Sequence, residues 1–284
     1  MFSNTFEYHR PQSIDEAIQL LHDVKGARLL AGGHSLIPAM KLRLASPAAL
    51  IDISRISDLV GIKSTKDGLR IGAMTTHNAI AISDVVRKNY PVLASTAGNI
   101  GDQQVRNRGT IGGSVSHADP GADFPTVLLL LDATFTATGK KGEREIAAKD
   151  FFVDLFTTSL KEGEILTSVT VPVESAGASA VYLKHRHPAS AFAVVGVAAL
   201  AAMKNGKADD VRVSIGGVMA SPVRAKAAEK ALTGQAANES TIGRAAEAVR
   251  DSLKHPLSDS YASGEFRVHL ATVMAKRALA QVCK

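Results

Sequence analysis

The sequence predicts an α+β protein with two domains, and three observations support this. The 284 residues are 45% apolar and 21% charged, a balance typical of globular chains. This length exceeds the roughly 100–200 residues of one ordinary domain. Short apolar strands alternate with helical patterns in the first part of the chain, and a second such unit follows a small polar stretch at 174–179. We expect that stretch to be a linker between the domains.

The chain opens with a β-α-β pattern. Ser13 and Glu16 have the spacing of a capping box, and an apolar face follows them, so a helix is expected from here to a point near Gly26. Apolar runs at 28–31 and 50–53 predict two short buried strands.

The middle of the chain is more varied. A third strand is expected at 69–73, a helix at 76–89 and the start of another helix at 92–96. Residues 98–125 show neither helical nor strand periodicity and contain six glycines and two prolines. Long segments of this kind inside compact domains are usually functional or disordered, and the embedded Val and Ile favour an ordered functional segment.

The remaining elements follow from shorter patterns. Residues 127–131 are an apolar helix or strand, 133–138 a strand, 139–144 a basic turn and 165–173 a strand. In the last third of the chain we expect strands at 194–203 and 211–218, a helix at 223–232 with Ser221 as N-cap and Pro222 at its first position, and helices at 240–253 and 265–282.

Composition excludes several classes of protein. The one cysteine, Cys283, excludes an internal disulfide framework and any cysteine-ligated iron–sulfur cluster or Cys-rich zinc site built from this chain alone. The net charge of +6 is spread along the chain and there are only 13 aromatic residues, so we expect no nucleic-acid partner. No signal peptide and no membrane span is visible, and we expect a cytoplasmic protein.

Two glycine-rich loops are the main candidates for a binding site. Ala31-Gly32-Gly33-His34-Ser35 follows a predicted strand, and Thr110-Ile111-Gly112-Gly113-Ser114 lies in the irregular segment. Paired glycines let backbone N–H groups converge on an anion, so two such loops suit a diphosphate. Neither loop has the pattern of a Rossmann fingerprint or a P-loop. A tight turn is the alternative interpretation of each loop alone.

Longer phrases around these loops resemble a known family. AGGHSLIPAMKLRLASP (31–47), RNRGTIGGSVSHADPGADFP (106–125), FEYHRPQSIDEAIQLL and IGAMTTHNAI together resemble the FAD-binding medium subunits of the molybdenum hydroxylases, most of all those of the aerobic carbon monoxide dehydrogenase group. The resemblance covers nearly the whole chain. It implies a vanillyl-alcohol-oxidase-like (PCMH-type) FAD-binding domain at 1–175, with subdomains at about 1–57 and 58–175, and a smaller C-terminal α+β domain at 176–284.

The resemblance also implies a cofactor and partners. FAD would be held by this chain, while a large subunit carries molybdopterin and a small subunit carries two [2Fe–2S] clusters. The complex would be a heterotrimer doubled into a hexamer, and it would pass electrons from the clusters through FAD to an external acceptor. The resemblance leaves the substrate and the acceptor open.

The cofactor-binding residues are carried over position by position. The first loop would hold the FAD diphosphate, the second would clamp the diphosphate and ribityl region, and Lys184 would lie near the flavin ring, where its charge favours negative charge on the ring. The implied cofactor-binding residues are Leu30, Ala31, Gly32, Gly33, His34, Ser35, Leu36, Ile37, Ile100, Thr110, Ile111, Gly112, Gly113, Ser114, Asp123, Leu166, Lys184 and Phe192. No catalytic acid, base or nucleophile is required from this chain.

Each of these roles has a plainer alternative. Ile100, Leu166 and Phe192 would be ordinary core residues in any fold, and Lys184 could belong to a solvated basic turn at 184–187. The side chains of His117, Asp119 and Asp123 have the types of a metal site, which we disfavour because Asp119-Pro120-Gly121 is a turn sequence. For the whole chain, a flavin-free assembly protein and a stand-alone flavin oxidase remain alternatives.

Overall fold

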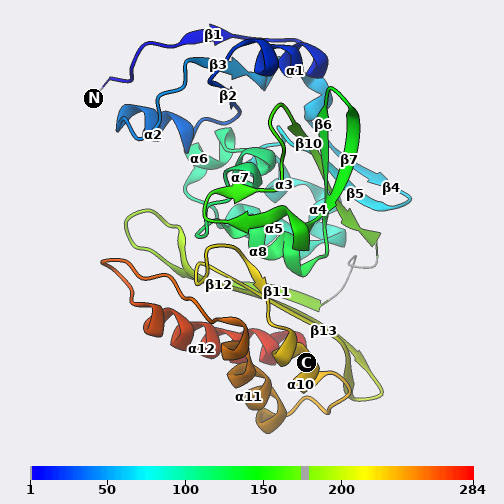
Figure 1. Cartoon of the computed structure of the whole chain (residues 1–284). Helices are drawn as coiled ribbons and strands as arrows, with labels where there is room; N and C mark the ends of the chain where they lie inside the picture. The colour runs from blue at the N-terminus through cyan, green and yellow to red at the C-terminus, as the bar shows by residue number, and fades with distance from the viewer. Residues whose placement is uncertain (1, 174–178) are drawn as a thin grey trace.

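Among the described residues, the three larger β-sheets are arranged one after another from the N-terminal to the C-terminal end of the molecule (Figure 1), and a two-stranded sheet accompanies the second. The computed structural model describes residues 2–173 and 179–284. The first sheet is parallel, with strand order β1-β3-β2. Its strands and the helices among them are β1 (Glu7–His9), α1 (Ile14–Asp23), β2 (Ala27–Leu30), α2 (Leu36–Lys41) and β3 (Ala49–Asp52).

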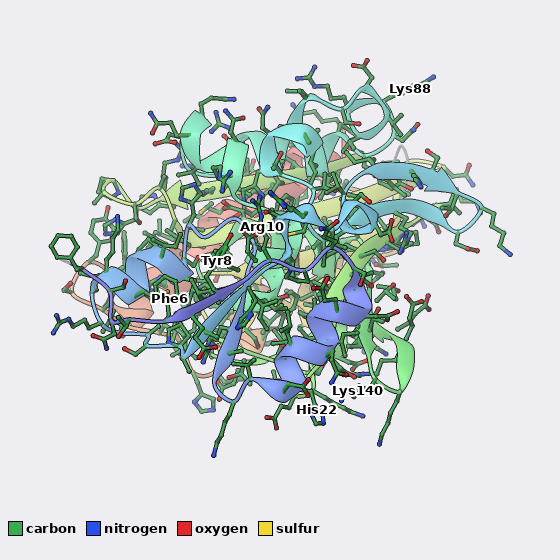
Figure 2. The ribbon with its side chains drawn as sticks, turned by 90° about the horizontal axis from the view of Figure 1, so that it is seen from above. Phe6, Tyr8, Arg10, His22, Lys88 and Lys140 are labelled. Carbon is green, nitrogen blue, oxygen red and sulfur yellow. The ribbon has the colours of Figure 1, made fainter. Side chains whose placement is uncertain are left out.

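Helix α1 begins as its sequence predicts. The Ser13 side chain accepts a hydrogen bond from the Glu16 amide at 3.1 Å, and a Glu16 carboxylate oxygen accepts one from the Gln12 amide at 2.8 Å. In a view from above, Tyr8 and Arg10 lie along the N-terminal strand (Figure 2). Both side chains reach Asp52 at the end of β3, so this strand is tied to the sheet by side chains as well as by its backbone.

The second sheet is antiparallel, with strand order β4-β5-β10-β6-β7. Its strands are β4 (Ile62–Thr65), β5 (Gly68–Gly72), β6 (Thr134–Gly139), β7 (Gly142–Ala147) and β10 (Ile165–Pro172). The short elements between and around them are η1 (Ile53–Arg55), η2 (Ser57–Leu59), α9 (Ala148–Phe151), β8 (Phe152–Asp154) and β9 (Thr157–Thr158). The strands expected at 69–73, 133–138 and 165–173 are confirmed.

A group of short helices packs beside this sheet. They are α3 (His77–Ile82), α4 (Asp84–Asn89), α5 (Pro91–Gly98), α6 (Gln103–Arg108), α7 (Ile111–His117) and α8 (Asp123–Leu130). The single helix expected at 76–89 is wrong in one respect: it is broken at Ser83, whose side chain caps α4. The expectation that 98–125 lacks regular structure is also wrong. Asp102 and Thr110 cap two helices too short to show a clear period.

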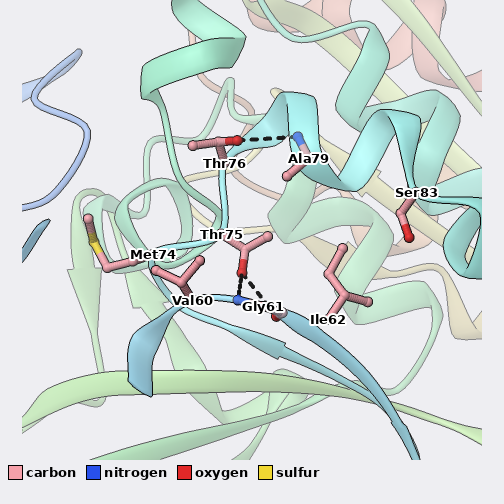
Figure 3. A pocket seen from close by; sticks show the side chains of 8 residues that line it. All are labelled: Val60, Gly61, Ile62, Met74, Thr75, Thr76, Ala79 and Ser83. Carbon is pink, nitrogen blue, oxygen red and sulfur yellow. Dashed lines mark hydrogen bonds between the residues drawn. The ribbon is translucent and has the colours of Figure 1, made fainter. Parts of the chain in front are cut away.

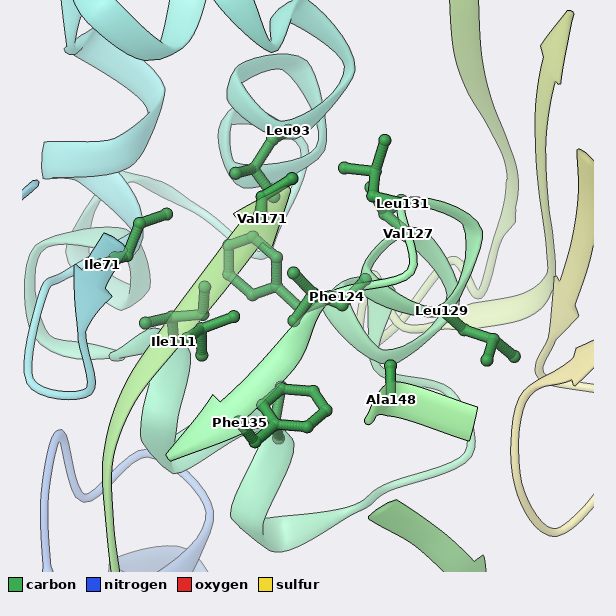
Figure 4. Close-up of a cluster of buried hydrophobic side chains, with 14 of the residues drawn as sticks. Ile71, Leu93, Ile111, Phe124, Val127, Leu129, Leu131, Phe135, Ala148 and Val171 are labelled. Atoms are coloured by element: carbon green, nitrogen blue, oxygen red, sulfur yellow. The ribbon is translucent and has the colours of Figure 1, made fainter. Parts of the chain in front are cut away.

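The main hydrophobic core lies between the helices and the second sheet. Phe124 on α8 is fully buried among Leu93, Ile111 and Val171 (Figure 4). In the same core, Phe135 packs against the rings of Phe151 and Phe152. Every residue of α8 is buried, which explains the unbroken apolar run at 127–131. The run is a helix, one of the two forms that its sequence allowed.

The C-terminal domain has an antiparallel sheet with strand order β11-β12-β13-β14. Its elements are β11 (Ser179–Arg186), β12 (Ala193–Lys204), β13 (Lys207–Gly216), β14 (Val223–Arg224), α10 (Lys226–Leu232), α11 (Glu239–Glu247), η4 (Ala248–Ser252) and α12 (Gly264–Val282). The strands expected at 194–203 and 211–218 are β12 and β13, and the last helix is as expected, whereas β11 and β14 were not predicted. The cap predicted at Ser221 and Pro222 is wrong, because β14 intervenes and α10 begins at Lys226. The linker expected at 174–179 falls on residues 174–178, which are outside the described residues.

The two domains are joined by direct packing of α8 on the C-terminal sheet. The Ser214 hydroxyl donates to the Thr126 carbonyl at 2.6 Å, and a Cβ on Gly216 would collide with the Thr126 hydroxyl. Arg224 of β14 binds Asp132, just beyond α8, at 2.8 Å. Because these contacts are buried or paired, they fix the position of β13 and β14 relative to the first domain.

Candidate functional site

The two glycine-rich loops meet at a close crossing of the backbone. A Cβ on Gly32 would collide with the Arg108 carbonyl and lie 2.8 Å from the Gly109 Cα. Next to this crossing, a Cβ on Gly113 would lie 3.5 Å from the Ala31 Cβ. Segments almost eighty residues apart in the sequence therefore form one surface, and glycine at position 32 permits their contact.

The first loop presents backbone donors. Gly33 has φ +77°, in the left-handed region, and turns the chain between β2 and α2. Within 2–173 and 179–284, the amides of Gly32, Gly33, His34 and Ser35 donate to no protein acceptor. A run of free amides at a left-handed turn is a concave anion-binding surface. His34, Ser35 and Ile37 are exposed, while Leu30, Ala31 and Leu36 are half-buried.

The second loop is used differently. The Ile111 amide donates to the Thr75 carbonyl at 3.1 Å and the Gly112 amide to the Ala73 carbonyl at 2.8 Å. The Gly113 amide donates to the Thr110 hydroxyl at 3.1 Å. The first donors of α7 are thus satisfied within the protein. Ile111 and Gly112 are buried, which leaves Gly113 and Ser114 as the half-buried part of this loop that faces the crossing.

His77 supports the crossing from below. Its amide donates to the Gly109 carbonyl at 2.9 Å, and its Nε2 lies 2.7 Å from where a Gly109 Cβ would be. The ring packs against Phe124, and burial lowers the pKa of His77 to about 4. The imidazole is therefore neutral at ordinary pH and fills the space under the loop without adding charge.

A small pocket of about 360 Å³ lies between the Val60–Ile62 segment and the start of α3 (Figure 3). It is lined mainly by apolar side chains, among them Val60, Ile62 and Met74. Its polar side chains are already bonded within the protein: the Thr75 hydroxyl to Gly61, the Thr76 hydroxyl to the Ala79 amide and the Ser83 hydroxyl to the Val86 amide. This pocket offers no unpaired polar group for recognising a ligand.

Lys184 and Asp123 form a buried ion pair at the boundary of the two domains. Lys184 Nζ lies 2.7 Å from Asp123 Oδ2, and the two side chains are only 7% and 4% exposed. The Tyr182 hydroxyl donates to Asp123 Oδ1 at 2.6 Å. Burial raises the pKa of the Asp123 carboxyl, while the ion pair and the tyrosine hydrogen bond oppose that rise. The solvated basic turn that was an alternative for Lys184 is wrong, because Lys184 belongs to strand β11.

The same cluster reaches the segment before α6. The Asn99 carbonyl accepts hydrogen bonds from Lys184 Nζ at 3.4 Å and from Arg186 at 3.1 Å. The next residue, Ile100, is half-buried and packs against the main core. Two of the residues singled out in the sequence, Asp123 and Lys184, are therefore in direct contact, and a third, Ile100, directly follows the residue whose carbonyl Lys184 binds.

Leu166 and Phe192 occupy contrasting positions. Leu166 on β10 is 4% exposed and belongs to the main core. Phe192, in the loop between β11 and β12, is 43% exposed and lies beside Gly121, two residues before α8. Only Phe192 of these two has a side chain that a bound molecule could contact broadly.

Comparisons with known proteins agree with this arrangement. Residues 4–174 match the family model for the FAD binding domain in molybdopterin dehydrogenase, and residues 180–282 match that for the CO dehydrogenase flavoprotein C-terminal domain. The chain belongs to the FAD-binding medium subunits of the molybdenum hydroxylases. This confirms the family, the oxidoreductase class and the fold class that the sequence motifs indicated.

Two curated relatives illustrate the range of this family. The carbon monoxide dehydrogenase medium chain of Afipia carboxidovorans is 38% identical over 280 residues, which is 98% of this medium subunit and 97% of the relative. The glyceraldehyde dehydrogenase medium chain of Sulfolobus acidocaldarius is 37% identical over 282 residues, 99% and 100% of the two chains. Relatives with similar identity thus belong to enzymes named for different substrates.

Solved structures have the same fold. A carbon monoxide dehydrogenase from Hydrogenophaga pseudoflava that lacks the Mo-pyranopterin moiety matches with a TM-score of 0.95 and 39% identity over 99% of this medium subunit and 98% of its chain. Quinoline 2-oxidoreductase from Pseudomonas putida matches with a TM-score of 0.95 and 34% identity over 100% and 98%.

The residues of the medium subunit fit FAD at the glycine crossing. The free amides of the first loop can donate hydrogen bonds to an anion. A side chain at Gly32 or Gly112 would collide with backbone atoms of the neighbouring segment. Sequence reasoning missed His77, Asn99 and Tyr182. Tyr182 had a usable signal: it lies two residues before Lys184, and strand residues two apart share a face.

Proposed function

We propose that this medium subunit binds FAD across the crossing of its two glycine-rich loops and passes electrons from the [2Fe–2S] clusters of a small partner subunit to an external acceptor. The observation that carries this proposal is the joining of the loops at Gly32 and Gly109, with a row of free amides on one side. The redox chemistry belongs to FAD, and the residues of this chain bind it, orient it and exclude water.

Within this proposal, the parts of the site have distinct tasks. The first loop, Leu30–Ile37, holds the diphosphate through its free amides. The second, Thr110–Ser114, contributes the half-buried surface of Gly113 and the Ser114 side chain, since Ile111 and Gly112 are buried and the amides of residues 111–114 are bonded within the protein. Ile100, Asp123, Leu166, Lys184 and Phe192 complete the set that we assign to the cofactor. Leu166 acts through the core behind the site, because its side chain is buried.

We also propose the domain division at residues 1–175 and 176–284, with subdomains at about 1–57 and 58–175. The large partner subunit would carry molybdopterin and the small one two [2Fe–2S] clusters, as a heterotrimer doubled to a hexamer in the cytoplasm. Among residues 2–173 and 179–284, no helix combines the length and apolar character that a membrane crossing requires. Relatives named as medium chains or subunits of several dehydrogenases support a multi-subunit assembly.

The test is direct. The purified chain should show the visible absorption of a bound flavin in about equimolar amount after loading with FAD. Co-expression with its partner subunits should give a complex that reduces this flavin when substrate is added. A chain that takes up no FAD under these conditions would refute the proposal, and a chain that oxidises a substrate without partners would show a stand-alone oxidase instead.

A further inference from the structure

Tyr182 is a buried tyrosine at the boundary of the two domains. It lies on β11 of the C-terminal sheet, yet its ring belongs to the core of the FAD-binding domain, together with Ala198 and Leu200 of β12. The neighbouring strand makes room for its hydroxyl at Gly196, where a Cβ would collide with Tyr182 Oη. The position of this hydroxyl is therefore tightly fixed by packing.

The hydroxyl is the first member of a hydrogen-bonded chain. It donates to Asp123 Oδ1 at 2.6 Å, Lys184 Nζ binds Asp123 Oδ2 at 2.7 Å, and the same Nζ lies 3.4 Å from the Asn99 carbonyl. Without the tyrosine, a single partner would define the carboxylate, which could then rotate about its terminal torsion. With both oxygens bonded, the carboxylate plane is fixed, and so is the position of the lysine ammonium.

We propose that Tyr182 is a positioning residue of the FAD site: through Asp123 it fixes the ammonium of Lys184 and the backbone at Asn99 and Ile100. This inference rests on the proposed FAD site, to which Asp123, Lys184 and Ile100 are assigned. Tyr182 itself need not touch the cofactor. Its contribution is to hold a buried charge in one place, which matters because electrostatic effects of a fixed charge at a bound group depend on distance.

Two substitutions break the same hydrogen bond by different routes. Tyr182→Phe removes the hydroxyl and keeps the ring, while Gly196→Ala displaces the hydroxyl without removing it. Matched controls are Tyr90→Phe, a buried tyrosine that donates to the Pro172 carbonyl at 3.2 Å, and Gly243→Ala, where a Cβ meets no atom within 4 Å. FAD affinity and the flavin midpoint potential are measured on the full chain.

We expect Tyr182→Phe and Gly196→Ala each to raise the FAD dissociation constant roughly three- to tenfold, the scale of one lost hydrogen bond. The flavin midpoint potential should also shift, and it should shift in the same direction in both variants. The two controls should leave both quantities unchanged. Affinity and potential of the Tyr182→Phe chain equal to those of the Tyr90→Phe chain would overturn the proposal. Failure of the unmodified chain to bind FAD would instead refute the proposed function.

A second comparison separates positioning from simple loss of packing. In an Asp123→Leu, Lys184→Met background, Tyr182→Phe should have no further effect on FAD affinity, because both the acceptor of its hydroxyl and the ammonium that this acceptor positions are gone. If that background binds FAD too weakly, urea unfolding of the FAD-free chain replaces the affinity measurement, and the loss caused by Tyr182→Phe should shrink in this background. An undiminished effect in the chosen measurement overturns the proposal.

Discussion

Replacement of Lys184 by Met should leave the Asp123 carboxylate buried without its cation. Asp123 is 4% exposed, so the carboxyl either remains charged in the interior or takes up a proton. Protonating a carboxyl with an unfolded-state pKa of about 3.9 costs about 4 kcal/mol at pH 7 and about 1.5 kcal/mol at pH 5. These values set the upper limit of the stability that the unpaired Asp123 carboxylate can cost, because the carboxyl takes up a proton whenever burying its charge would cost more.

The sign of the pH dependence follows from proton counting. In the Lys184→Met chain the folded state binds a proton that the unfolded state releases between about pH 4 and pH 7, so stability falls as pH rises through this range. The double variant Lys184→Met, Asp123→Asn has no such carboxyl. The double variant should therefore be more stable than the single variant at pH 7, and this difference in stability should be much smaller at pH 5.

Urea unfolding of the FAD-free chains at these two pH values measures both effects. The unmodified chain provides the reference at each pH, and the difference between single and double variants isolates the stranded charge. A Lys184→Met loss that is equal at pH 5 and pH 7, and no larger than that of the double variant, would refute the view that Lys184 and Asp123 form a buried ion pair.

Two further predictions concern the loop crossing. Gly33→Val and Gly113→Val should each abolish FAD binding in chains that still fold. Gly33 has φ +77°, which valine rarely adopts, and a Cβ on Gly113 would lie 2.9 Å from the Thr110 hydroxyl. Full flavin content in either variant would show that the loop assignment is wrong. The pKa of His77 is lowered to about 4 in the folded protein. The free energy of unfolding should therefore fall by about 3 kcal/mol as pH falls from 6.5 to 4, because the unfolded chain binds a proton at His77 that the folded chain does not. Acid unfolding curves should lose that slope in His77→Leu, and an unchanged slope would place the acid sensitivity elsewhere.

The sequence predicted elements best where one pattern decides them. Ser13 and Glu16 located α1, and apolar runs located most strands of the second and third sheets, because burial on one or both faces leaves a clear period. Helices α6 and α7 were missed because six or seven residues hold fewer than two turns, and glycines form part of the second. The helix expected after Ser221 failed because a two-residue strand pairs there with β13.

The candidate site could be predicted in part. The glycine pairs are local and visible in the sequence, but their meeting at Gly32 and Gly109 depends on the packing of two sheets, which no local pattern encodes. The roles of Asp123 and Lys184 as a buried pair were equally hidden, since 61 residues separate them. The assignment of individual residues to FAD stays a prediction.

The small core of the first sheet has a consequence for local unfolding of this protein. Residues such as Ala17, Ile51 and Ile53 pack there with only a few others, and Met74 and Ile165 of the following subdomain complete the cluster. Such a unit should open locally more often than the helices around Phe124 do. A cofactor that contacts both loops binds only while this unit is closed, so it lowers the frequency of opening. Backbone amides in β2 and β3 should therefore exchange with solvent deuterium more slowly in the FAD-bound chain than in the FAD-free chain. The cofactor then stabilises the contact between the two subdomains.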